Sequence, residues 1–301
     1  MLISKGNTSE LKKMIEGGKD VCCSGLHFSS RWFLLSSISS GRLNFIILPT
    51  REEAEYCACD LYNIIEGDRV FFLPDSAINL QKSSFKSTVE VQRTSAITEI
   101  SRYKDKDTLY IVTYPEAIEE GVPSLKKLKK PLLSLRKDME ITHSRISEIL
   151  ITNGFEKVDF VAQPGQFALR GGILDVFSYD FNFPYRISFF GNEIEGINIF
   201  DANSQLSKES VPTVDIMANL SSTEDTENES LFKIVSDKAL LWLDSYDLYK
   251  EKNFTREFES RQKVFIGTPL GGADAAGKVA FNITPQPVFN KNFELLTEDI
   301  R

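Results

Sequence analysis

The sequence contains few residues of the kinds that bind metals or form disulfide frameworks. It has four cysteines and two histidines in 301 residues. Cys22 and Cys23 are adjacent, and Cys57 and Cys59 are two residues apart, so neither pair has the C-x2-C spacing of a zinc site. Residues i and i+2 of a helix also point to different sides, which disfavours joint ligation by Cys57 and Cys59. We therefore expect free, buried thiols and no metal or other cofactor.

Long hydrophobic runs and an excess of positive charge are also absent. No stretch reaches the roughly 18–20 apolar residues of a membrane span, and residues 1–20 hold no signal-peptide core. The 35 basic and 43 acidic residues give a net charge of −8, whereas binding to bare nucleic acid requires clustered lysine and arginine. We expect a soluble cytoplasmic protein with no membrane contact and only weak, nonspecific binding to DNA.

The composition, with 42% hydrophobic and 26% charged residues, is that of a globular protein with two or three domains. Continuous apolar runs at 44–48, 69–73 and 109–113 each stop near a proline, as buried parallel strands do. The segments between them, 51–65 and 89–102, have the pattern of helices. Strands that alternate with helices across short links predict a parallel α/β layer, of an NTPase-like or flavodoxin-like class.

The pattern changes after Gly121. A basic stretch at 123–137 predicts a solvated linker, with weak contact to DNA phosphates as the alternative; its charges are Lys126, Lys127, Lys129, Lys130, Arg136 and Lys137. Thr142 can cap a helix that ends at Gly154 and has Ile146, Ile149 and Leu150 on one face. Antiparallel strand signals follow.

An acidic, polar stretch at 221–230 predicts a loop, and residues 239–243 predict one more buried strand. We therefore expect three parts: an α/β domain at 1–122, a small domain at 123–230, and a further α/β portion at 231–301. The last stretch, 285–301, ends on charges without completing a helix, so we expect a piece of a longer protein.

Gly191 and Asn192 separate two strand patterns, which predicts a two-residue hairpin. Simple pairing places Phe190 opposite Glu193, Ser188 opposite Glu195, and Arg186 opposite Ile197. Alternation puts one set of side chains on the core face, namely Tyr185, Ile187, Phe189 and Ile194, and another on the outward face, namely Arg186, Ser188, Phe190, Glu193 and Glu195. An aromatic beside an arginine on a rigid sheet is typical of a binding hot spot, although ordinary surface is the alternative.

A resemblance to a known domain rests on three stretches of the sequence: residues 163–177 (QPGQFALRGGILDVF), residues 184–201 (PYRISFFGNEIEGINIFD), and Ser204-Gln205. Together they resemble the domain shared by the repair protein UvrB and the N-terminal UvrB-homology module of bacterial transcription-repair coupling factors (Mfd). The resemblance is strong over about 138–207 and collinear over the flanking α/β part. It implies a helicase-like, P-loop NTPase-type parallel α/β domain with an inserted small α+β domain that contains an antiparallel sheet.

Three departures from UvrB distinguish the two branches of this family. The stretch aligned with the phosphate loop has Gly25 but then Phe28, Ser30, Arg31 and Trp32, where the family has Gly, Gly, Lys and Ser or Thr. The strand at 239–243 is followed by Asp244-Ser245, where an active enzyme has Asp-Glu to orient the attacking water. The interval 75–88 is too short for UvrB's DNA-binding aromatic hairpin.

The chain therefore resembles the coupling-factor module, which implies that it is not an enzyme although the full-length parent is an ATP-dependent DNA translocase. The resemblance implies docking of the damage sensor UvrA on Arg170, Arg186 and Phe190, and concealment of this surface by the parent's own C-terminal part. A salt bridge from Arg170 to Asp175 or Glu193 is the alternative role for that arginine. A UvrB-type repair helicase and an unrelated α/β enzyme with an acidic cleft are the alternative functions.

Overall fold

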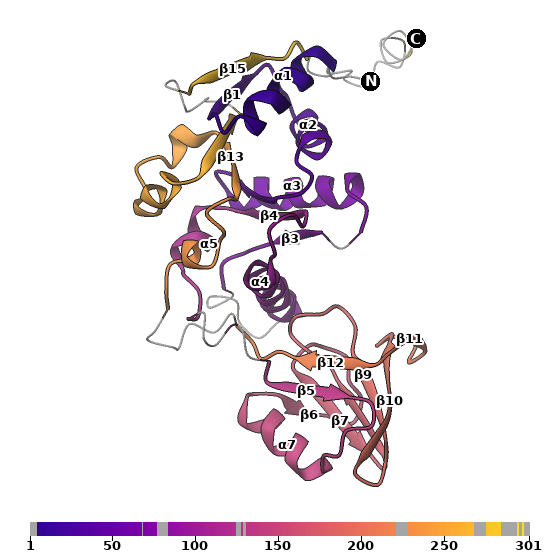
Figure 1. Cartoon of the computed structure of the whole chain (residues 1–301). Helices are drawn as coiled ribbons and strands as arrows, with labels where there is room; N and C mark the ends of the chain where they lie inside the picture. The colour runs from indigo at the N-terminus through magenta and orange to yellow at the C-terminus, as the bar shows by residue number, and fades with distance from the viewer. Residues whose placement is uncertain are drawn as a thin grey trace.

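The computed structural model describes residues 5–67, 69–76, 84–124, 128, 131–220, 228–267, 275–283, 294 and 297, with backbone only at 84–87. These residues form a seven-stranded sheet, a six-stranded sheet and a two-stranded ribbon. The larger sheet and its helices make one unit, and the two smaller sheets with one helix make the other (Figure 1). In the part of the chain that is described, no helix is long and apolar enough to cross a membrane.

The seven-stranded sheet is parallel throughout, with the order β15-β1-β14-β13-β2-β4-β3. Its strands are β1 (Val21–Ser24), β2 (Leu43–Ile47), β3 (Val70–Phe72), β4 (Leu109–Thr113), β13 (Leu240–Asp244), β14 (Gln262–Ile266) and β15 (Gly277–Ala280). The expected strands at 44–48, 69–73, 109–113 and 239–243 are confirmed to within a residue or two at each end. Every residue of β2, β4 and β13 is buried, which explains their unbroken apolar sequences.

Helices cover both faces of this sheet. The helical segments are α1 (Lys5–Glu16), α2 (Ser30–Ile38), α3 (Arg51–Ile64), α4 (Ser84–Arg102), α5 (Pro115–Glu119), η1 (Leu231–Lys233), η2 (Tyr246–Leu248) and η3 (Asn253–Phe258). In β13, Leu240 and Trp242 belong to the cluster that includes α1, α2 and α3, whereas Leu241 and Leu243 belong to the cluster on α4, α5 and the 231–258 segment. The parallel α/β class is therefore confirmed.

The smaller unit has a six-stranded sheet with the order β11-β10-β9-β8-β7-β6. Its strands are β6 (Glu156–Lys157), β7 (Gln166–Arg170), β8 (Ile173–Val176), β9 (Tyr185–Phe190), β10 (Glu193–Phe200) and β11 (Ser207–Val211). All neighbours are antiparallel except β6 and β7. Helix α7 (His143–Thr152) and the ribbon of β5 (Leu133–Arg136) with β12 (Thr213–Ile216) contribute to the same core.

Helix α7 forms as the sequence predicts. The Thr142 side chain accepts a hydrogen bond from the backbone N–H of Arg145, and Gly154 has the positive φ of +82° that ends such helices. Ile146 and Leu150 are buried, and Ile149 packs against the edge of the core. The helix thus covers one face of the six-stranded sheet and does not contact the other face.

Two expectations about the strands need correction. A bulge between Ile194 and Gly196 shifts the hairpin register, so Ser188 faces Gly196 and Arg186 faces Asn198, whereas the Phe190–Glu193 pair is as predicted. The stretch 123–137 is not linker throughout, because β5 occupies its end; Lys126, Lys127, Lys129 and Lys130 lie outside the described residues.

The cysteine prediction is confirmed in part. None of the four cysteines forms a disulfide bond. Cys23 and Cys57 are buried, and burial raises the pKa of Cys23 to about 12. Cys59, however, is exposed, because positions i and i+2 of α3 face opposite sides.

The boundaries 1–122, 123–230 and 231–301 remain predictions. Strands from the first and third of these parts lie in one sheet, since β13 and β14 stand between β1 and β2. Residues 77–83, half of the interval 75–88, lie outside those described. At the boundary between the two units, Arg102 of α4 lies 3.6 Å from Asp180 and 3.8 Å from Asp215.

The buried Arg93 of α4 provides a test of this core. It is 1% exposed, donates to the carbonyls of Pro74 and Gly121 at 2.6 Å each, and lies 3.5 Å from Glu120. Arg93→Ala should lower the free energy of unfolding by about 3–5 kcal/mol, because it leaves these acceptors unpaired. The half-exposed Arg102→Ala is the control, with a loss within about 1 kcal/mol in urea melts. If both variants lost the same unfolding free energy, water would be able to replace the hydrogen bonds of the Arg93 guanidinium.

Candidate functional site

The predicted docking residues lie on three neighbouring strands of the six-stranded sheet. Arg170 ends β7, Arg186 is in β9, and Asp175 of β8 stands between them, directly opposite Arg186 in the register. Arg186, Ser188 and Phe190 alternate with the buried Ile187 and Phe189, so they point away from the core covered by α7. The expected core and outward faces of the hairpin are therefore confirmed.

Asp175 binds both arginines. Its Oδ1 accepts from Arg186 Nε at 2.7 Å and its Oδ2 from Arg186 Nη2 at 2.9 Å, which is a bidentate pair. Its Oδ2 also accepts from Arg170 Nη2 at 2.5 Å. The Arg170–Asp175 salt bridge offered as an alternative role is thus present, and Arg186 joins it.

Each guanidinium also rests on an aromatic ring. Arg170 lies over the ring of Phe160, 4.6 Å from its centroid, and Arg186 lies over Phe200 at 4.3 Å. The side-chain oxygen of Gln205 accepts a further bond from Arg186 at 3.0 Å. Hydrogen bonding to Asp175 raises the pKa of Arg186.

Exposed apolar side chains surround the two arginines. Phe190 is 76% exposed, and Phe160, Ile173 and Leu206 are exposed as well. Ile173 faces Arg170 on one side and Ser188 on the other in the strand register, and Leu206 follows Gln205. We call the surface of Phe160, Arg170, Ile173, Arg186, Phe190 and Leu206 the arginine face. This combination of guanidinium and apolar groups suits binding to an acidic and partly apolar surface.

Sequence reasoning found Arg170, Arg186 and Phe190 but missed Phe160, Ile173 and Leu206 as members of this surface. It named Asp175 only as an alternative partner of Arg170 and missed its bond to Arg186. Alternation along β8 places Asp175 and Ile173 on one face, and this signal was available once β8 was known to lie between β7 and β9. Phe160 and Leu206 lie outside the strands, where periodicity carries no information.

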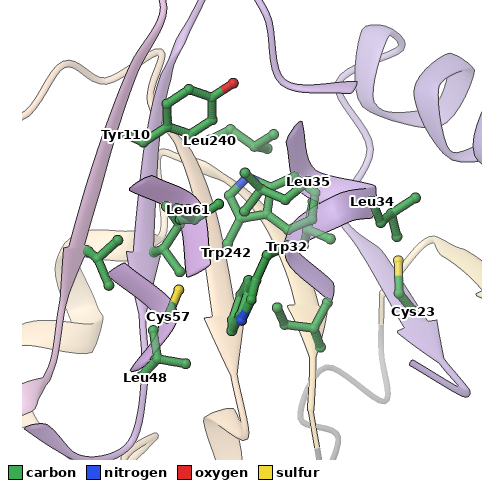
Figure 2. Packing of buried hydrophobic residues seen from close by; sticks show 14 of the residues in the cluster. Cys23, Trp32, Leu34, Leu35, Leu48, Cys57, Leu61, Tyr110, Leu240 and Trp242 are labelled. Atoms are coloured by element: carbon green, nitrogen blue, oxygen red, sulfur yellow. The ribbon is translucent and has the colours of Figure 1, made fainter. Parts of the chain in front are cut away.

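The stretch aligned with a phosphate loop does connect a strand to a helix, β1 to α2, but other groups fill it. Gly25 has φ +71°, and a Cβ there would lie 1.7 Å from the carbonyl oxygen of Phe281. Phe28 is exposed with φ +48°, and the Ser30 hydroxyl bonds the backbone of His27. Trp32 points into the core beside Trp242, as Figure 2 shows.

Arg31 and the strand-end pair Asp244-Ser245 are brought together. The Arg31 guanidinium forms an ion pair with Asp244 Oδ2, and Ser245 Oγ donates to Asp244 Oδ1 at 2.8 Å. Asp244 is 2% exposed, and a Cβ on Gly267 would lie 1.9 Å from its carboxylate. Burial raises the pKa of Asp244, while Arg31 and Ser245 oppose this rise.

The residues of the arginine face lie in a stretch that is similar to a known protein family. Residues 133–221 match the family described as the UvrB interaction domain, which spans the smaller unit. The chain is 25% identical over 203 residues to the transcription-repair-coupling factor of Bacillus subtilis, covering 67% of this chain and 17% of that protein.

Two further relatives carry the same name. The factor of Staphylococcus aureus (strain bovine RF122 / ET3-1) is 25% identical over 218 residues, or 71% of this chain and 18% of that protein. The factor of Escherichia coli K12 is 25% identical over 158 residues, or 52% of this chain and 13% of that protein. The matched region thus spans less than a fifth of each of these relatives.

The Arg31–Asp244 pair leads to a prediction about pH. A carboxyl group whose pKa is raised on folding contributes less stability as the pH rises, because the folded state holds the proton more tightly than the unfolded state. Arg31→Ala removes the main group that opposes this rise. The variant should lose about 3 kcal/mol of unfolding free energy near pH 7 and progressively less as the pH falls towards about 4.

Denaturant melts of Arg31→Ala and the parent over this pH range measure the difference. In Arg31→Ala/Asp244→Asn the pH-dependent part of the loss should vanish, since no buried carboxyl remains to ionise. A loss that is the same at every pH would contradict the role given to Asp244.

Proposed function

We propose that this chain, a UvrB-homology module of the transcription-repair coupling factor (Mfd) type, recruits the excision-repair ATPase UvrA through the arginine face. The observation that carries this proposal is the position of Arg170, Arg186 and Phe190 on one side of one rigid sheet, within the residues that match the UvrB interaction domain. Two fixed guanidiniums beside exposed apolar groups can bind a partner surface but offer no group for catalysis.

The charges of the arginine face favour a partner surface with carboxylates. The two arginines and Asp175 together carry a net charge of +1, and each guanidinium has N–H groups beyond those that Asp175 accepts. Phe190 can bury nearly its whole ring on contact. Because the sheet holds these groups in place before binding, little conformational entropy is lost on association.

In the parent protein, the proposed role is to connect stalled RNA polymerase to nucleotide excision repair, with an ATP-dependent translocase elsewhere in the chain. The parent's own C-terminal part covers the arginine face until UvrA is needed. A UvrB-type repair helicase would require an open phosphate loop, whereas Gly25, Arg31 and Trp32 are all engaged with other parts of this chain.

Phe190→Ala is the sharpest test of docking. The side chain is exposed, so its removal leaves the core intact, but its buried area would be lost from the complex. We expect UvrA affinity to fall roughly 30-fold or more in a titration of the whole chain, with an unchanged thermal midpoint. Phe33→Ala is the matched control, because Phe33 is 53% exposed on α2 of the other unit.

Arg170→Ala and Arg186→Ala should each weaken UvrA binding by about 30- to 1,000-fold. These variants also leave the buried Asp175 with one arginine fewer, so their melts must be measured beside their affinities. If Phe190→Ala and Phe33→Ala bind UvrA as tightly as the parent, the docking surface lies elsewhere.

We further propose that the chain does not bind or hydrolyse ATP. Trp32 occupies the position of the Mg²⁺-binding hydroxyl and points into the core, and Arg31 is held by Asp244. Isothermal titration with Mg²⁺-ATP should give no binding heat at millimolar nucleotide, and phosphate release should equal the buffer blank. A turnover that disappears in Arg31→Ala would overturn this assignment.

A further inference from the structure

We propose that Asp175 is a positioning residue for docking, which holds the guanidiniums of Arg170 and Arg186 in their binding geometry without contacting the partner. The inference rests on the proposed function, because it explains how the arginine face is prepared for UvrA. Asp175 is 1% exposed and therefore lies beneath the surface that a partner would touch.

The hydrogen bonds of Asp175 show what it does. Both carboxylate oxygens accept from arginine, with Oδ1 bound to Arg186 Nε and Oδ2 shared between Arg186 Nη2 and Arg170 Nη2. A buried carboxylate with charged donors on both oxygens has one orientation, because rotation would break two or three charge-assisted bonds at once. Asp175 thus fixes the edge of each guanidinium.

Charge gives a second reason for this role. Arg170 and Arg186 come from β7 and β9, which are separated by β8, yet both reach the same carboxylate oxygen at 2.5 and 2.9 Å. Two guanidiniums at such short range repel each other, and the negative charge between them offsets that repulsion. Without Asp175, we expect each arginine to move away from the other.

The aromatic rings complete the arrangement. Phe160 supports the plane of the Arg170 guanidinium and Phe200 supports that of Arg186, while Asp175 fixes their edges. A guanidinium held by both face and edge presents its remaining N–H groups in a fixed direction. This geometry fits a carboxylate of the partner that approaches from the solvent side.

Asp175→Asn tests this assignment with little change of shape. The amide nitrogen cannot accept, so in either orientation of the amide at least one N–H of Arg186 loses its acceptor, and no negative charge remains to offset the repulsion between the two arginines. We expect UvrA affinity of the whole chain to fall roughly 5- to 100-fold, from the cost of ordering two long side chains again on binding. Asp105→Asn is the matched control, since this exposed carboxylate pairs with Lys238 on the other unit and the change in net charge is identical.

A double-variant cycle separates positioning from direct contact. If Asp175 acts through the arginines, Asp175→Asn should cost clearly less in an Arg186→Ala background than in the parent. If the affinity loss of the double variant equals the product of the two single losses, Asp175 contacts UvrA independently of Arg186. Tighter binding by Asp175→Asn would show instead that Asp175 competes with the partner for the guanidiniums, and either result overturns the proposal.

A measurement without UvrA tests the same point independently. The Nε–H of Arg186 should exchange slowly with water in the parent, because it donates to the buried Asp175 Oδ1 at 2.7 Å, and rapidly in Asp175→Asn. NMR of labelled arginine side chains reports this exchange. Equal exchange in both proteins overturns the positioning role, whereas slow exchange in a parent that fails to bind UvrA overturns the proposed function alone.

Discussion

A buried carboxylate needs a positive charge beside it, and in this protein an arginine supplies that charge at two places. One is the stretch between β1 and α2, and the other is the arginine face. Asp244 at the carboxyl end of β13 pairs with Arg31 of α2, and Asp175 of β8 pairs with Arg170 and Arg186. The two sites differ in their charge balance. The Arg31–Asp244 pair is neutral, whereas the cluster around Asp175 keeps one positive charge, which remains available to a partner.

Much of the fold could be predicted from the sequence, because the strands of a parallel sheet covered on both faces are continuous apolar runs. The strands β2, β4 and β13 follow this rule. The hairpin register could not be predicted beyond the turn. Gly196 permits a bulge after Ile194, but a glycine in a strand does not show by itself where the ladder shifts.

The arginine face was predicted from alternation along a single hairpin, which places Arg186 and Phe190 outward. Alternation cannot show which strand lies beside β9, and that neighbour decides what Arg186 touches. Once β8 takes this place, Asp175 lies opposite Arg186, and a side chain expected to face solvent is bound to a buried carboxylate. A sequence pattern therefore gives the direction of a side chain more readily than its partner.

The stretch between β1 and α2 is filled by several unrelated contacts at once. The carbonyl of Phe281 packs against Gly25, Trp32 lies in the core, and Arg31 is bound to Asp244. These contacts involve three different residues, so the stretch is held in place by more than one side chain. The parallel sheet adjoins the smaller unit through Arg102 of α4, while the arginine face lies on the six-stranded sheet of the smaller unit. Among the described residues, the side chains that fill the stretch between β1 and α2 and those of the arginine face belong to different sheets, so the contacts of one region do not depend on those of the other.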